Sequence, residues 1–174
     1  CRSGQHHSWC DWMDSGTEEF TDGILFMINE NDDGVMKRRW GFWKVLHKGT
    51  LVSTGMEYKI KLLHIDPGKS ISLQYHDHRD EYWIVLQGTA SAEIGPEEMG
   101  NKFATHNFTL NAYPEEDWGK PRHEMQVIPA NTIHKITNTG TDALIILELQ
   151  EGTETNEEDI TRLEKIDGED DRIK

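Results

Sequence analysis

Short apolar segments separated by turn residues recur along the chain. Some of them end at clusters of turn-forming residues, such as residues 66–68 (Asp-Pro-Gly) and 138–140 (Asn-Thr-Gly). The apolar segments cover residues 24–28, 40–46, 58–65, 71–75, 82–86, 126–128, 133–137 and 143–149. Many short strands at such spacing, with Gly, Pro and Asn turns between them, are typical of a sandwich or barrel. The pattern therefore predicts an all-β domain.

The apolar pattern divides the chain into parts. Residues 1–36 read as an N-terminal arm followed by one hairpin strand at 24–28, because residues 31–34 (Asn-Asp-Asp-Gly) have the composition of a tight turn. Residues 37–152 carry most of the remaining strands and form the expected barrel. Within them, residues 91–124 are a long acidic stretch without a clear period. Such a stretch is either a functional lid or an excursion with its own structure.

Residues 153–174 predict a short C-terminal helix and a tail. Asn156 is a suitable N-cap, and the acidic residues after it favour the positive end of a helix dipole. The helix would carry an apolar stripe formed by Ile160, Leu163 and Ile166. At helical spacing, Arg162 would form a surface ion pair with Glu158. The acidic run over residues 154–159 is expected to be a solvated face.

Charge and composition exclude several classes of partner. The formal net charge of −14 argues against nucleic acid, because binding a phosphate backbone requires a basic surface. A small phosphorylated ligand stays compatible with this charge, since a few local Lys and Arg residues can bind it. The chain has no apolar run near the ~20 residues that span a bilayer, so no membrane association is expected. Cys1 and Cys10 match no zinc or redox spacing, and a reduced, cytoplasmic location is the expectation.

One segment concentrates residues that can bind a metal ion. On an extended strand, Gln74, His76 and by the same alternation His78 point the same way. Glu81 begins the next strand and can face the same point, and His134 supplies a further imidazole at a strand start. Imidazole, carboxylate and amide ligands suit a divalent first-row ion, with Zn²⁺, Mn²⁺, Fe²⁺ and Ni²⁺ all chemically admissible.

These segments resemble the two motifs of the cupin superfamily, in which a His-x-His pair precedes Glu and, later, Pro and His. Pairing His76 with His78 leaves only two residues before Glu81, which is short for the family. Pairing Gln74 with His76 leaves four residues before Glu81, and six residues then precede Gly88, which both fit. The resemblance implies a double-stranded β-helix or jelly-roll barrel, with His78 just outside the metal shell. The metal ligands that it implies are Gln74, His76, Glu81 and His134.

The ligand set is similar to the zinc site of type II phosphomannose isomerases, the C-terminal cupins of bifunctional mannose-1-phosphate guanylyltransferases. The stretches that match this group are residues 39–41, 58–61, 74–90, 128–138, 148–152 and 158–162. Three features depart from it: Arg39 replaces the usual Pro, Glu154 lies near an expected aromatic residue, and the stretch 91–124 is longer than usual. The sequence also contains no nucleotidyltransferase domain before the cupin, so guanylyl transfer is not expected of it.

The resemblance implies a metal-dependent mannose-6-phosphate isomerase-like enzyme. Such an enzyme interconverts an aldose 6-phosphate and its ketose in the supply of sugar nucleotides and polysaccharides, with Zn²⁺ as the expected ion. Two other functions stay open: a non-catalytic sugar-binding or regulatory cupin, and an iron cupin oxygenase. Gln74 speaks against the oxygenase, whose sites more often use three imidazoles. The expected partners are a small phosphorylated sugar and a second copy of the chain, since cupins can share an edge strand.

Further residues are candidates for acting on the sugar phosphate. Glu148 occupies the expected barrel side of a strand and is the leading candidate for a general base, with His78 as the other candidate. Lys61 would face the barrel interior if its strand packs against a second layer, whereas a solvated face is the ordinary alternative. The resemblance assigns Arg162 a catalytic role in gripping the substrate. The remaining candidates for substrate binding are Arg79 and Gln150.

Overall fold

The computed structural model describes residues 33–96, 106–112 and 123–164, and these residues contain eleven β-strands and one 3₁₀ turn. The strands are β1 (Val35–Arg38), β2 (Gly41–Thr50), β3 (Glu57–Ile65), β4 (Gln74–Tyr75), β5 (Arg79–Gln87), β6 (Thr89–Pro96), β7 (His106–Asn111), β8 (Met125–Ile128), β9 (Thr132–Asn138), β10 (Leu144–Gly152) and β11 (Thr161–Arg162). The 3₁₀ turn η1 covers Glu157–Asp159.

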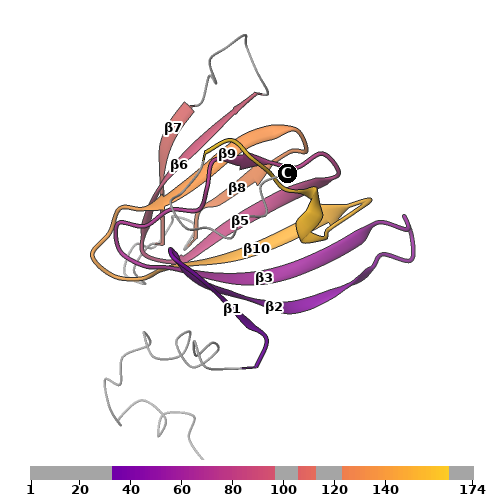
Figure 1. The fold of residues 1–174 in the computed structure, drawn as a ribbon, viewed down its shortest axis with the longest axis horizontal. Helices are drawn as coiled ribbons and strands as arrows, with labels where there is room; N and C mark the ends of the chain where they lie inside the picture. Colours follow the sequence, from indigo (N-terminus) through magenta and orange to yellow (C-terminus); the bar gives the residue numbers. More distant parts are fainter. Residues whose placement is uncertain (1–32, 97–105, 113–122, 165–174) are drawn as a thin grey trace, which may run out of the picture.

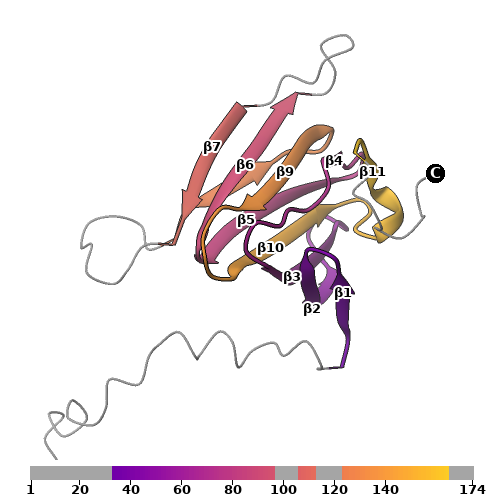
Figure 2. The same ribbon diagram turned by 60° about the vertical axis from the view of Figure 1, so that its left-hand side comes forward.

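The strands form two antiparallel sheets that face each other (Figure 1). The larger sheet has the strand order β1-β2-β3-β10-β5-β8, and the smaller one has the order β11-β4-β9-β6-β7. Figure 2 shows β4 and β11 side by side at one end of the barrel, beside the turn η1. This architecture confirms the all-β barrel that the alternating sequence pattern predicts.

The main apolar core lies between the two sheets. Trp83 and Ile146 of the larger sheet and Ala92 and Ile136 of the smaller one are all 0% exposed and belong to a single cluster. A second apolar cluster contains Leu62, Ile145, Phe42, Leu86 and Leu147. Because side chains alternate between the faces of a strand, this second cluster lies on the outer face of the larger sheet.

Strand β10 is central to the larger sheet, and its register positions the polar residues of the interior. Glu148 pairs with Lys61 of β3 on one side and with Trp83 of β5 on the other, and Gln150 pairs with Glu81 of β5. Residues that are directly opposite in an antiparallel pair share a face. The register therefore places all five side chains on the inner face of the sheet.

The long stretch over residues 91–124 contributes strands to the smaller sheet. Strands β6 and β7 pair with each other and β6 also pairs with β9, so the described part of this stretch belongs to the smaller sheet of the barrel. Residues 97–105 and 113–122 lie outside the described residues, as does the expected strand at 24–28. The expected strand at 71–75 is shorter in the structure, where only Gln74–Tyr75 belongs to β4.

The predicted C-terminal helix is wrong for the residues that the structure describes. Asn156 does act as an N-cap, since its side chain accepts hydrogen bonds from the backbone N–H groups of Glu158 and Asp159. The helical turn ends at once, because Ile160 is extended (φ −107°, ψ 117°) and Arg162 enters β11. Pairing of β11 with β4 takes the place of helical hydrogen bonds. Glu158 and Arg162 therefore do not have the helical spacing on which their expected ion pair was based.

In the described part of the chain, no helix has the length and hydropathy of a bilayer span.

Gly152 lies where β10 passes closest to the turn before β5, which makes it a test of this packing. A Cβ atom there would lie 2.0 Å from the carbonyl oxygen of His78 and 2.7 Å from the Cα atom of Arg79. We expect Gly152→Ala to lower the free energy of unfolding by about 1–3 kcal/mol, as overpacking typically does. Denaturant unfolding measures the change.

The matched control is Gly140→Ala, where the nearest atom to the added Cβ is Asn138 Oδ1 at 3.5 Å. That separation is ordinary van der Waals contact, so its unfolding curve should stay close to that of the original protein. Equal stability of the two variants would contradict the packing described for Gly152.

Candidate metal centre and active-site pocket

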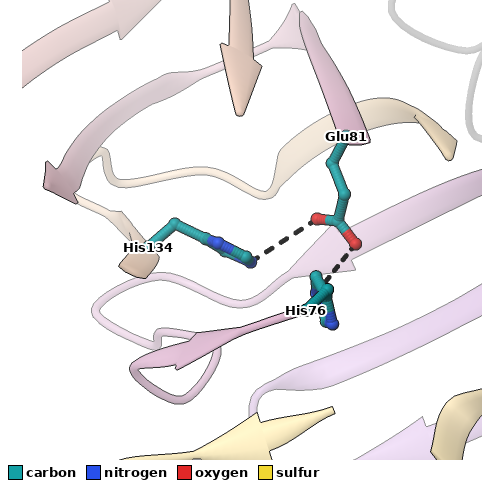
Figure 3. Close-up of side chains that lie close together, drawn as sticks. All are labelled: His76, Glu81 and His134. Atoms are coloured by element: carbon teal, nitrogen blue, oxygen red, sulfur yellow. Dashed lines mark ion pairs between the residues drawn. The ribbon is translucent and has the colours of Figure 1, made fainter. Parts of the chain in front are cut away.

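Three side chains from different segments of the chain converge inside the barrel (Figure 3). His76 follows β4, Glu81 lies in β5 and His134 lies in β9, and all three are at most 2% exposed. Their candidate ligand atoms lie within 4.8 Å of one another. His76 Nε2 is 2.9 Å from Glu81 Oε1, and His134 Nε2 is 3.6 Å from Glu81 Oε2. These separations are comparable with those between ligands held about 2.1 Å from one metal ion.

Backbone carbonyl groups fix the tautomers of the two imidazoles. His76 Nδ1 lies 2.8 Å from the carbonyl oxygen of Asp159, and His134 Nδ1 lies 2.8 Å from that of Thr132. A carbonyl oxygen can only accept, so both Nδ1 atoms carry hydrogen. Burial lowers the pKa of His134 to about 4, against the partial opposition of the Glu81 charge. In the neutral ring, Nε2 then presents a lone pair to the cluster, as a metal ligand must.

The electrostatics of the cluster fit a bound cation. Burial alone would raise the pKa of Glu81, but His76, His134 and Arg79 together hold it well below its usual value. Among the described residues, the buried atoms Glu81 Oε2 and His134 Nε2 have no hydrogen-bond partner. Buried polar atoms are rarely left without a partner, so these two atoms indicate that a further group binds between them. The donor set therefore suits a divalent ion.

The structure distinguishes Gln74 from His78. Gln74 pairs directly with His134 across β4 and β9, so its side chain lies on the same face, and it lines the pocket next to the cluster. Its Oε1 atom accepts a hydrogen bond from Ser72 Oγ (3.0 Å). His78 is exposed and lies outside the pocket lining, because the chain turns after His76 and strand alternation ends there. The expectation that His78 acts on substrate is not supported by its position.

A second set of polar side chains, centred on Glu148, adjoins the cluster. Gln150 Nε2 donates to Glu81 Oε1 (2.9 Å) and to Glu148 Oε1 (2.8 Å), and Trp83 Nε1 donates to Glu148 Oε2 (3.1 Å). Burial raises the pKa of Glu148, and the nearby charge of Glu81 raises it further. Lys61 lies 3.7 Å from Glu148 and its side chain is only 7% exposed, so it faces the interior rather than solvent.

Several of these groups line one pocket, which includes Gln74 and Glu81 of the expected ligand set. Its lining includes all the expected substrate-binding and general-base residues except His78. The lining residues are Arg38, Trp40, Trp43, Lys61, Leu63, Ile71, Ser72, Gln74, Arg79, Glu81, Glu148, Gln150, Glu157, Ile160 and Arg162. The pocket thus brings together two of the expected metal ligands, the buried carboxylate of Glu148 and several cations.

Arg79 and Arg162 have different positions in this pocket. Arg162 reaches the lining from β11, which pairs with the strand of Gln74. Arg79 is 2% exposed, and its guanidinium contacts Glu81 Oε1 (3.2 Å) and Asp159 Oδ2 (3.4 Å). Arg79 therefore balances buried carboxylates, which leaves it poorly suited to binding a phosphate group.

Sequence reasoning missed several residues of the site. Arg38 and Trp43 line the pocket, and the Trp43 ring lies 5.9 Å from the Arg38 guanidinium and 4.6 Å from Lys61 Nζ. Glu157 forms an ion pair with Lys61 at 2.8 Å, and Asp159 is buried, so the run over 154–159 is not simply a solvated face. The stretch 158–162, which resembles the isomerase family, contains Asp159 and was the available signal for that residue.

A comparison with known families matches most of the chain. The family model described as "Mannose-6-phosphate isomerase C-terminal" matches residues 28–110 and 115–165. These two ranges include every candidate ligand and every pocket residue named above.

Curated relatives agree with that match. The chain is 30% identical over 145 residues to mannose-1-phosphate guanylyltransferase RfbM of Salmonella typhimurium, which covers 83% of this chain and 26% of the relative. It is 37% identical over 131 residues to a mannose-1-phosphate guanylyltransferase of Salmonella muenchen, covering 75% and 22%. The chain thus spans about a quarter of the length of these relatives.

The fold has solved counterparts at lower identity. The capsular polysaccharide assembling protein CapF from Staphylococcus aureus superposes with a TM-score of 0.56 at 15% identity, covering 75% of this chain and 34% of that one. At this identity the likeness shows the fold alone, which is the cupin barrel. With the family match over most of its length, the chain belongs to the mannose-6-phosphate isomerase C-terminal family of cupins.

Proposed function

We propose that this chain is a metal-dependent isomerase that interconverts mannose 6-phosphate and fructose 6-phosphate. The observation that carries the proposal is the shared pocket, in which Glu81 of the candidate metal site lies beside the buried carboxylate of Glu148 and the cations Lys61 and Arg162. Membership of the family supports the substrate class. The relatives' names, mannose-1-phosphate guanylyltransferases, support a role for the proposed reaction in sugar-nucleotide supply.

The metal would be held by His76, Glu81 and His134, with Gln74 as the fourth ligand. Zn²⁺ is the ion we expect for this mixed set, and Mn²⁺, Fe²⁺ and Ni²⁺ remain chemically admissible. When bound, the ion supplies Lewis acidity that polarises the carbonyl and the adjacent hydroxyl of the sugar. The protein's own contribution to this chemistry is orientation of the ligands and exclusion of water.

Glu148 is the proposed general base. It takes the proton from C2 of the aldose and returns it to C1, while a second proton moves from the C2 hydroxyl to the C1 oxygen. A base for this step must lie within hydrogen-bond reach of the carbon-bound proton. The hydrogen bonds from Trp83 and Gln150 hold the Glu148 carboxylate in place, and Lys61 at 3.7 Å stabilises its charged form.

The phosphate group would bind to cations of the pocket lining, for which Arg38, Lys61 and Arg162 are the candidates. Charge-assisted bonds to these donors would fix the sugar's orientation relative to Glu148. Because Glu157 already pairs with Lys61, an incoming phosphate would compete with that carboxylate.

We also propose that the chain pairs with a second copy of itself, as the sequence analysis expects.

Substitution His134→Ala tests the metal site. We expect elemental analysis to find a divalent ion in the purified protein and to find it lost from the variant, because a buried ligand is removed. Turnover of mannose 6-phosphate, followed by a coupled assay for fructose 6-phosphate, should disappear in the variant and after chelation.

His47→Ala is the matched control, since His47 is exposed and bonds only Tyr58 in the described part of the chain. It should retain metal and turnover. Tight sugar-phosphate binding without turnover in the original protein would instead indicate a binding module, and bound iron with oxygen uptake would indicate an oxygenase.

Substitution Glu148→Gln tests the general base. The amide keeps the size of the side chain but cannot take a proton, so we expect kcat to fall by about 10²- to 10⁴-fold with metal content unchanged. Glu151→Gln is the control, because Glu151 lies on the same strand β10 but points to the outer face of the sheet, opposite to Glu148. Near-normal kcat in Glu148→Gln would assign the base to another residue.

A further inference from the structure

The segment after β10 crosses one end of the barrel and contacts the candidate metal site without providing a ligand. From Gly152 the chain passes through η1 and then pairs, as β11, with the strand that carries Gln74 (Figure 2). Asp159, the last residue of η1, thereby lies against the turn between His76 and Arg79. Its side chain is 1% exposed.

Asp159 makes two separate kinds of contact with this turn. Its backbone carbonyl accepts a hydrogen bond from His76 Nδ1 (2.8 Å). Its carboxylate accepts from the backbone N–H of Asp77 (3.0 Å) and of His78 (3.3 Å). The carboxylate therefore fixes the segment to the turn, and the position of the carbonyl depends on that attachment.

The carboxylate of Asp159 also pairs with Arg79, whose Nη1 atom lies 3.4 Å away and also donates to the carbonyl of Asn156 (2.8 Å). The same guanidinium contacts Glu81 Oε1 (3.2 Å) and His76 Nε2 (3.3 Å). Arg79 thus shares its charge between Asp159 and the candidate metal ligands. Without the Asp159 charge, Arg79 would bind Glu81 more strongly and compete with a metal ion for it.

We propose that Asp159 is a positioning residue of the metal centre, which orients His76 and draws the charge of Arg79 away from Glu81. The inference rests on the metal site of the proposed function and names a determinant of its affinity. Groups that orient metal ligands typically change affinity by about 10- to 100-fold when they are substituted.

Substitution Asp159→Asn tests this role, because the amide has the size of the carboxylate but lacks its charge. Zn²⁺ and Co²⁺ affinities would be measured by competition with a chelator, and the Co²⁺ absorption spectrum would report ligand geometry. We expect affinity about 10- to 100-fold weaker and an altered spectrum. Asp159→Glu, which restores the charge at a shifted position, should recover part of the affinity.

Glu158→Gln is the matched control, since Glu158 belongs to the same turn but is exposed; it should bind both ions like the original protein. Thermal unfolding of the metal-free proteins distinguishes a purely structural role of Asp159 from a role in metal binding. Lower stability of both Asp159 variants with unchanged affinity and spectrum would overturn the inference while leaving the metal site intact. An original protein that binds neither ion would overturn the proposed function and this inference together.

Discussion

The buried carboxylate of Glu81 is the group around which the interior of this barrel is arranged. An ionised carboxylate removed from water is unfavourable by several kcal/mol unless partners compensate it. Here His76, His134, Arg79 and Gln150 surround it, and each comes from a part of the chain that the barrel topology brings close. The remaining polar residues of the pocket follow from this need for compensation.

Outward from Glu81, positively and negatively charged side chains alternate. Arg79 lies between Glu81 and Asp159, and Lys61 lies between Glu148 and Glu157. Each cation is therefore shared between a carboxylate of the interior and one of the η1 turn. This arrangement connects the turn to the pocket electrostatically, although the turn follows the last long strand.

Strand alternation, which a sequence displays directly, predicted the all-β barrel. The resemblance to the two cupin motifs, and not periodicity, implied that His76, Glu81 and His134 would converge, because His134 lies far along the chain from the other two. The sequence left Lys61 open between a solvated face and the barrel interior, and the structure places it in the interior, where it is 6% exposed. Ligation of a metal by Gln74 stays a prediction, as do the cytoplasmic location and the second copy.

The errors arose where tertiary contacts override local signals. The cap at Asn156 is real, but hydrogen bonds from residues 77–79 to Asp159 and pairing of β11 stop the helix after one turn. Strand alternation alone would have kept His78 on the inner face, whereas the turn after His76 leaves it exposed. Arg38 and Trp43 lie far along the sequence from the motifs, and only the strand order brings them to the pocket.

The two faces of β10 impose a limit on how this family can change length. One face carries Ile146, Glu148 and Gln150, and the other carries Ile145 and Leu147 in the outer apolar cluster. Because successive residues point to opposite faces, a single inserted or deleted residue exchanges the two sets. Insertions in the connections around this strand can therefore be tolerated, but within it only substitutions preserve both the polar interior and the packed exterior.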